Sequence, residues 1–186
     1  MLKIFVILIV GICGTQGQVP VLDDCPDFDV VENFDLNRYL GKWYEQYRYA
    51  NFFELMGKCV TAEYSLNANG SVNVHNAQVN ILTGKPKTID GYAVPAGEIT
   101  EAKFIVNFPV GGFSPNAPYW VLDTDYETYS VVWSCEKLPL ISTRFLWLLS
   151  REQNASDETV KKMYAVLDKY NIDRSFMVST EQENCS

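Results

Sequence analysis

The segment Arg144-Phe145-Leu146-Trp147-Leu148-Leu149-Ser150 is apolar at every position from 145 to 149. Neighbouring side chains of a β-strand point to opposite faces of the sheet. A strand with this composition must therefore be covered on both faces. A strand that lines a barrel with one face and lies under a helix with the other has this pattern.

The residues that follow predict the covering helix. Ser156 is a good N-cap, and Asp157 and Glu158 favour the positive end of the helix dipole. One apolar face is formed at spacings of i, i+3, i+4 and i+7 by Val160, Met163, Tyr164 and Leu167. We expect this C-terminal helix to pack outside the last strands, and residues 176–179 to add a short final strand.

Upstream, short runs of alternating apolar residues are separated by Gly, Pro and Asn. They predict eight strands, at residues 42–49, 58–66, 71–80, 87–94, 102–108, 118–123, 128–135 and 144–150. Eight strands without intervening helices are typical of an all-β antiparallel sandwich or barrel.

The N-terminus has the pattern of a signal peptide. Lys3 is followed by an apolar run at 4–12, and Thr15 and Gly17 precede a plausible cleavage site before Gln18. The run is short for the competing interpretation, a membrane anchor. We therefore expect a leader at 1–17, a single domain at 18–186, and a secreted, extracellular protein.

Charge and cysteine content narrow the function classes. The net charge is −8 and no basic stripe is present, which argues against a nucleic-acid partner. Four cysteines of the expected mature chain, Cys25, Cys59, Cys135 and Cys185, suggest two disulfides, for which spacing leaves three pairings open. His75 is the single histidine, so no metal site is expected.

Two turn-like sequons, at Asn69 and Asn154, predict N-glycosylation. No chain feature demands a dimer, so a monomer or weak oligomer is expected.

Three motifs fall at defined positions among the predicted strands. Gly41-Lys42-Trp43 opens the first strand, Thr124-Asp125-Tyr126 joins the sixth to the seventh, and Arg151 ends the eighth. In this order, the motifs resemble the lipocalin family. Residues 33–35, 39–45, 117–122 and 171–173 are most similar to its branch of apolipoprotein D, Lazarillo and insect bilin-binding proteins.

The resemblance implies an eight-stranded up-and-down barrel that encloses one small ligand in a calyx, with the helix packed outside. It also implies that Cys25 pairs with Cys135 and Cys59 with Cys185. A structural role, rather than ligand contact, is implied for the motif residues Gly41, Trp43, Thr124, Asp125, Tyr126 and Arg151.

Strand alternation predicts which side chains face the ligand if Trp43 points inward. The predicted lining is Tyr47, Ala62, Tyr64, Asn76, Gln78, Ile89, Phe104, Val106, Phe108, Tyr119, Ser134, Phe145 and Trp147. The resemblance singles out Asn76 and Trp147 as ligand contacts. A barrel filled by its own side chains is the alternative.

Glu45 is the one acidic residue that this alternation places inside. It could bind a ligand, but a hydrogen bond to a nearby tyrosine hydroxyl is the favoured interpretation. His75 is expected to face outward and the cysteines to be bridged, so nucleophilic or acid–base catalysis lacks its residues. We therefore expect no enzymatic activity.

The predicted function is extracellular transport of a fatty acid, sterol, retinoid or similar lipid. No cofactor is expected, unless biliverdin is bound as a chromophore. A biliverdin-binding pigment protein is one alternative, and a signalling or adhesion lipocalin that acts through its surface is another.

The loops at the open end are rich in apolar residues, including Phe52, Phe53, Leu140 and Ile141. Exposed apolar clusters often mark partner surfaces. We expect this rim either to touch a membrane or lipoprotein or to fold inward and line the mouth.

Overall fold

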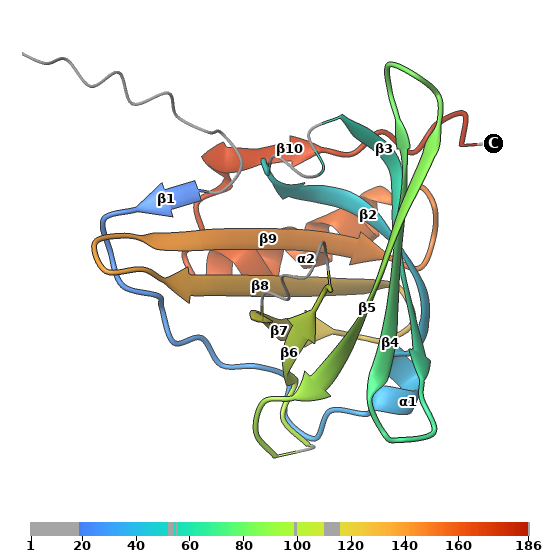
Figure 1. The fold of residues 1–186 in the computed structure, drawn as a ribbon. Coiled ribbons are helices and arrows are strands. Elements are labelled where there is room, and N and C mark those ends of the chain that lie inside the picture. The colour runs from blue at the N-terminus through green and yellow to red at the C-terminus, as the bar shows by residue number, and fades with distance from the viewer. Residues whose placement is uncertain (1–18, 52–53, 55, 99, 110–115, 186) are drawn as a thin grey trace, which may run out of the picture.

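The computed structural model describes residues 19–51, 54, 56–98, 100–109 and 116–185. Within them, eight antiparallel strands form a closed barrel (Figure 1). These strands are β2 (Gly41–Tyr49), β3 (Gly57–Leu66), β4 (Val72–Asn80), β5 (Pro86–Pro95), β6 (Lys103–Asn107), β7 (Asn116–Thr124), β8 (Tyr129–Lys137) and β9 (Ser142–Ser150). The predicted eight-stranded all-β barrel is confirmed. The expected leader at 1–17 lies outside the described residues.

The barrel closes where β2 pairs with β9, from Tyr44 opposite Ser150 to Arg48 opposite Trp147. Two short strands extend this seam. β1 (Val19–Val21) pairs with the start of β9, and β10 (Met177–Ser179) pairs with the end of β2. The predicted final strand is confirmed as β10, which follows the one-turn 3-10 helix η1 (Arg174–Phe176), whereas β1 had no counterpart among the predicted strands.

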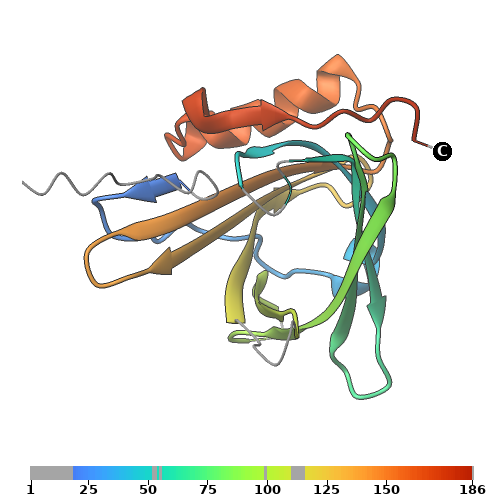
Figure 2. The same ribbon diagram turned by 45° about the horizontal axis from the view of Figure 1, so that its top comes forward.

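The helix α2 (Asp157–Lys169) lies along the outside of the barrel beside β10 (Figure 2). Ser156 caps it, since its hydroxyl accepts a hydrogen bond from the Thr159 amide at 3.2 Å. Met163 and Leu167 are fully buried in the same cluster as Leu146 and Leu148 of β9. Each buried side chain of this size contributes about 1.5–3 kcal/mol. The apolar run at 145–149 is therefore explained as predicted, with alternate residues under the helix and inside the barrel.

Both disulfides have the pairing that the resemblance implied. Cys25–Cys135 fastens the N-terminal segment to β8, and Cys59–Cys185 fastens the C-terminal tail to β3. Each bridge closes a loop of more than a hundred residues, for which about 2–5 kcal/mol of stabilisation is typical.

Trp43 plugs one end of the barrel and is fully buried. Its indole nitrogen donates to the carbonyl oxygen of Tyr39, at the end of the short helix α1 (Leu36–Tyr39), over 2.9 Å. Gly41 has a φ of +91°, a value that glycine adopts without strain. The chain can therefore turn sharply from α1 into β2 and seal this end.

The other motif residues meet at the same closed end. Arg151 donates hydrogen bonds to the carbonyl oxygens of Lys42 and Tyr126. Asp125 accepts the amide of Thr128 at 2.7 Å, and Tyr126 accepts the amide of Asp35 through its hydroxyl at 3.1 Å. Thr124 accepts the Tyr126 amide at 3.0 Å. These contacts are all internal to the protein, as a structural role requires.

No helix among the described residues combines the length and the apolar character needed to cross a lipid bilayer.

Candidate functional site: a cavity inside the barrel

The barrel encloses a cavity of about 750 Å³ that receives side chains from each of its eight strands. Small-molecule sites commonly have volumes of roughly 300–1,000 Å³. The cavity walls are mainly aliphatic and aromatic, with a few polar groups. A barrel filled by its own side chains is thereby excluded, even though Phe145 and Trp147 stack with ring centroids 5.7 Å apart.

Strand alternation located most of this lining correctly. The predicted residues found around the cavity are Ala62, Tyr64, Asn76, Gln78, Ile89, Phe104, Val106, Phe108, Tyr119, Ser134, Phe145 and Trp147. The structure shows that these residues line the cavity, and their contact with a ligand stays a prediction. His75 lies on the outer surface as expected and pairs with Asp90 at 2.6 Å.

The prediction that Tyr47 lines the cavity is wrong. A β-bulge between Glu45 and Tyr47 places one extra residue in β2, so Glu45 pairs with Leu149 while Tyr47 pairs with the adjacent Leu148. The extra residue reverses the alternation. Tyr47 therefore faces outward and packs on Tyr164 of α2, with ring centroids 5.8 Å apart.

The expectation that Glu45 is the one inward acid is also wrong, because Glu54 and Glu136 line the cavity as well. Glu54 lies between β2 and β3, where strand alternation makes no prediction. β8 runs two residues further than predicted, so the alternation that turns Ser134 inward applies to Glu136 too.

Glu45 has other partners than the expected tyrosine. Its carboxylate accepts from Arg48 at 3.2 Å and from the Thr180 hydroxyl. Arg48 also pairs with Glu54, at 3.5 Å, so one guanidinium serves two carboxylates. Burial raises the pKa of Glu45, the nearby Glu54 charge raises it further, and Arg48 opposes both effects. Burial raises the pKa of Glu54 as well.

Three tyrosine hydroxyls form a polar group within the apolar lining. The Tyr119 hydroxyl lies 2.9 Å from that of Tyr39 and 2.8 Å from that of Tyr64. Tyr39 also reaches the hydroxyl of Ser130 at 2.9 Å. Burial raises the pKa of Tyr39 to about 12 and that of Tyr119 well above its usual value, so these groups stay neutral. Sequence reasoning missed Tyr39 because α1 was not predicted.

Asn76 lines the cavity, but its side-chain oxygen is not exposed to the open space. Its side-chain oxygen is buried and has no hydrogen-bond partner among the described residues. Such an acceptor costs about 1–3 kcal/mol when it stays unsatisfied.

Among the described residues, no group of three or more His, Cys, Asp or Glu side chains is arranged to hold a metal ion.

Comparison with known proteins agrees with this geometry. A family model described as a lipocalin-like domain matches residues 34–182. Apolipoprotein D of Macaca fascicularis is 39% identical over 187 residues, which span 100% of this chain and 97% of the relative. Lazarillo protein of Schistocerca americana is 37% identical, over 85% of this chain and 74% of the relative.

A relative named for its ligand and two solved structures complete the comparison. The bilin-binding protein of Pieris brassicae is 31% identical over 83% of this chain and 81% of its own. Insecticyanin of the tobacco hornworm Manduca sexta has a TM-score of 0.80 at 28% identity, covering 89% of both chains. Lobster apocrustacyanin A1 has a TM-score of 0.67 at 25% identity, covering 87% of this chain and 94% of its own.

Proposed function

The chain belongs to the lipocalin family, and we propose that it is a ligand-binding carrier rather than an enzyme and transports a small hydrophobic molecule outside the cell. The observation that carries this proposal is the cavity of about 750 Å³ with its apolar walls. Burial of roughly 200–400 Å² of apolar ligand surface provides about 5–10 kcal/mol before the costs of association. Micromolar affinity corresponds to about 8.2 kcal/mol net, so it requires the upper end of this range and a cavity that is already formed.

The polar groups of the cavity favour an uncharged ligand that can donate a hydrogen bond. Glu45, Glu54 and Glu136 line the cavity, and Lys87 is the one cation among the described lining residues. Arg48 compensates only part of this negative charge. A carboxylate in the cavity would therefore be repelled, whereas an uncharged hydroxyl could donate to one of the cavity carboxylates. Among the lipids considered, this selects a sterol or a retinoid alcohol over a fatty acid.

A matched set of retinoids tests this selection, because retinol, retinal and retinoic acid differ mainly in their terminal group. We expect retinol to quench the fluorescence of Trp147 and to bind most tightly, and retinoic acid most weakly. Asn76→Leu, which changes a polar side chain of the cavity wall, should change the affinity for retinol about three- to tenfold. Asn73→Leu, on the same strand but outside the cavity, is the control. If none of the three binds, the lipid proposal is wrong.

A bilin is the second candidate ligand, favoured by one relative named as a bilin-binding protein. Lys87 at the cavity could meet a propionate group of a bilin. An absorbance scan of the protein purified from its source separates the two candidates. Bands in the red part of the visible spectrum indicate a bilin, and their absence supports a colourless lipid.

Ligand exchange at a membrane or lipoprotein surface completes the proposal. Leu140, between β8 and β9, is 86% exposed, and Leu82, between β4 and β5, is 77% exposed. Ile141 is only half-buried, and Phe52 and Phe53 lie outside the described residues. The exposed leucines support a rim that inserts shallowly into lipid while the ligand passes.

Secretion is part of the same proposal and depends on removal of residues 1–17. The two disulfides suit an oxidising compartment. The sequon residues Asn69 and Asn154 are both exposed, so glycans could be attached there without disturbing the core.

A further inference from the structure

One stretch of the cavity wall has no side chain of its own. Gly91 lies at an inward position of β5, between Ile89 and Ala93, which both line the cavity. Gly91 does not border the open space, whereas Phe108 does. The wall at this point is therefore formed by an aromatic ring from the residue that follows β6.

The pairing of β5 with β6 brings Phe108 beside Gly91 (Figure 1). Tyr92 lies opposite Asn107, and the next step of this antiparallel register places residue 108 next to residue 91. Phe108 is half-buried and packs against the cluster of buried side chains inside the barrel. Its ring therefore lies on the inner side of the sheet, against the backbone of β5.

The missing β-carbon of Gly91 is what allows this close contact. A β-carbon added there would lie 2.6 Å from Cδ1 and 2.9 Å from Cε1 of Phe108, and 2.4 Å from the carbonyl oxygen of Asn107. Carbon atoms that are not bonded to each other prefer separations of about 3.5–4.0 Å. Because the added carbon would lie between the sheet and the ring, it would push the ring toward the centre of the cavity.

A glycine inside a strand weakens the strand, and it often marks a place where another group approaches closely. At Gly91 that group is the Phe108 ring. The close approach of the ring to the sheet leaves more of the barrel interior open to a guest. The width of the cavity at this level thus depends on the absence of a side chain at position 91.

We propose that Gly91 is a specificity-determining residue, which keeps the cavity wide enough for a rigid ligand of fused rings such as a sterol. The inference rests on the proposed function and concerns the width of the guest rather than its polar group. A sterol is broad along its fused rings, whereas retinol has a single ring and a narrow polyene chain. The contact between Gly91 and Phe108 therefore matters more for a sterol than for retinol.

The narrowing that a side chain would cause is small, but a rigid guest cannot avoid it. To regain ordinary contact with an added β-carbon, the Phe108 ring would have to move by about 1 Å. Closely packed apolar groups tolerate one extra carbon poorly when neither side can rearrange. Fused rings cannot bend away from the displaced ring, whereas a polyene chain can lie along another part of a cavity of about 750 Å³.

Dehydroergosterol and retinol are the probes, because both are fluorescent and accept excitation energy from tryptophan. We expect Gly91→Ala to weaken dehydroergosterol at least about tenfold and retinol less than about threefold. Gly97→Ala, just after β5, is the matched control, since its β-carbon would meet only the exposed carboxylate of Glu101, with Oε2 at 2.9 Å. This control should leave both affinities unchanged.

A double variant separates the width of the cavity from the stability of the fold. Gly91→Ala should also destabilise the protein, because the added carbon crowds the Asn107 carbonyl oxygen. In a Phe108→Ala background the ring is gone but this backbone contact stays, so Gly91→Ala should still lower stability and yet change the affinity for dehydroergosterol by less than about threefold. Circular dichroism confirms that each variant is folded. If Gly91→Ala does not fold, Phe108→Trp narrows the cavity at the same point and should weaken the sterol selectively.

The outcomes distinguish this inference from the function on which it rests. The inference is overturned if Gly91→Ala, or Phe108→Trp in its place, weakens both probes equally or neither, or if the loss of sterol binding persists in the Phe108→Ala background. In those cases the carrier function stands. If the wild type binds neither probe, the proposed function fails and the inference fails with it.

Discussion

Arg48 donates a hydrogen bond to the carboxylate of Glu45 over 3.2 Å, and both side chains are almost completely buried beside the barrel cavity. The nearby Glu54 competes for the same guanidinium at 3.5 Å. Two carboxylates thus share one buried cation. Burial raises the pKa of Glu45 and of Glu54, so the folded protein binds a proton here more readily than the unfolded chain does.

Because of these raised pKa values, the protein should become more stable as the pH falls from neutrality. Between the raised folded pKa and the unfolded value of 4.5, the folded state holds more protons than the unfolded state. The free energy of unfolding should therefore rise as the pH falls from neutrality toward 4.5, and the gain should be complete below that value. Urea denaturation at pH 7, 6 and 5 measures it.

Glu45→Gln and Glu54→Gln are the controls for this dependence, because each leaves one carboxylate for Arg48. Both variants should have a flatter pH profile than the wild type. Equal profiles in all three proteins would mean that another group is responsible.

The closed end depends on Arg151, whose guanidinium lies 3.7 Å from the centroid of the Trp43 ring and donates to several backbone carbonyls. Lysine cannot reproduce this planar, multiply bonded geometry. Arg151→Lys should lower the free energy of unfolding by about 1–3 kcal/mol without removing ligand binding. Lys42→Arg, which changes a neighbouring exposed cation, should be nearly neutral. Unchanged stability of Arg151→Lys would contradict this role.

The tyrosine cluster predicts a specific loss of stability. Tyr119→Phe removes the hydroxyl that bonds both Tyr39 and Tyr64 and leaves buried hydroxyl groups with fewer partners. We expect a loss of about 1–3 kcal/mol in chemical denaturation. Tyr92→Phe is the matched control, because Tyr92 is 42% exposed. Equal effects of the two substitutions would argue against a role for the cluster.

Membrane contact of the rim can be tested by flotation with phosphatidylcholine liposomes. The double variant Leu82→Ser/Leu140→Ser removes two of the most exposed apolar side chains and should float at least several-fold less than the wild type. Leu66→Ser is a control at the other end of β3, where a leucine is 51% exposed. Flotation that is equal in all three proteins would exclude the rim as the lipid-contacting surface.

Much of the barrel could be predicted because its strands alternate regularly. The inward positions of Ala62, Asn76 and Trp147 follow from a period of two residues. The period breaks at the bulge after Glu45, and no local sequence signal marks that extra residue, so Tyr47 was placed on the wrong face. The partners of Glu45 were missed for a related reason, since Thr180 reaches it from 135 residues away.

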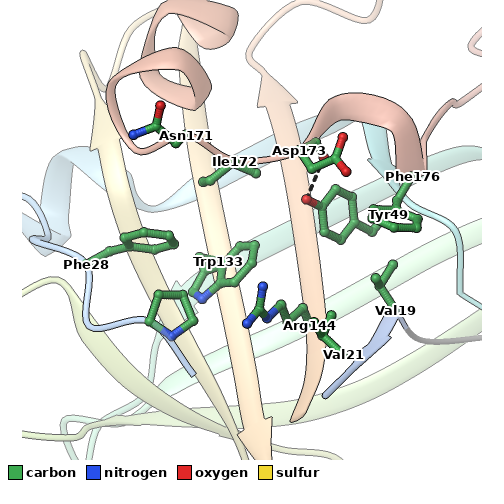
Figure 3. A pocket seen from close by; sticks show the side chains of 11 residues that line it. Val19, Val21, Phe28, Tyr49, Trp133, Arg144, Asn171, Ile172, Asp173 and Phe176 are labelled. Atoms are coloured by element: carbon green, nitrogen blue, oxygen red, sulfur yellow. Dashed lines mark hydrogen bonds between the residues drawn. The ribbon is translucent and has the colours of Figure 1, made fainter. Parts of the chain in front are cut away.

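A small pocket on the outside of β8 and β9 could not be predicted from the sequence (Figure 3). It requires Phe28, Trp133, Arg144 and Phe176 from four segments that meet only after the barrel, a disulfide and α2 are in place. Arg144 and Trp133 appear in the sequence as ordinary strand residues. Only the structure shows that Trp133 Nε1 and Arg144 Nε are buried without an acceptor among the described residues.

The central claim is that an apolar guest occupies the space inside the barrel. Titration of the protein with retinol, followed by tryptophan quenching and compared with Ala62→Trp, tests it most directly, because this substitution adds an indole to the cavity wall. We predict one retinol per chain for the wild type and a loss of binding of at least about tenfold in the folded variant. Equal binding by the two proteins would place the ligand elsewhere and contradict the account.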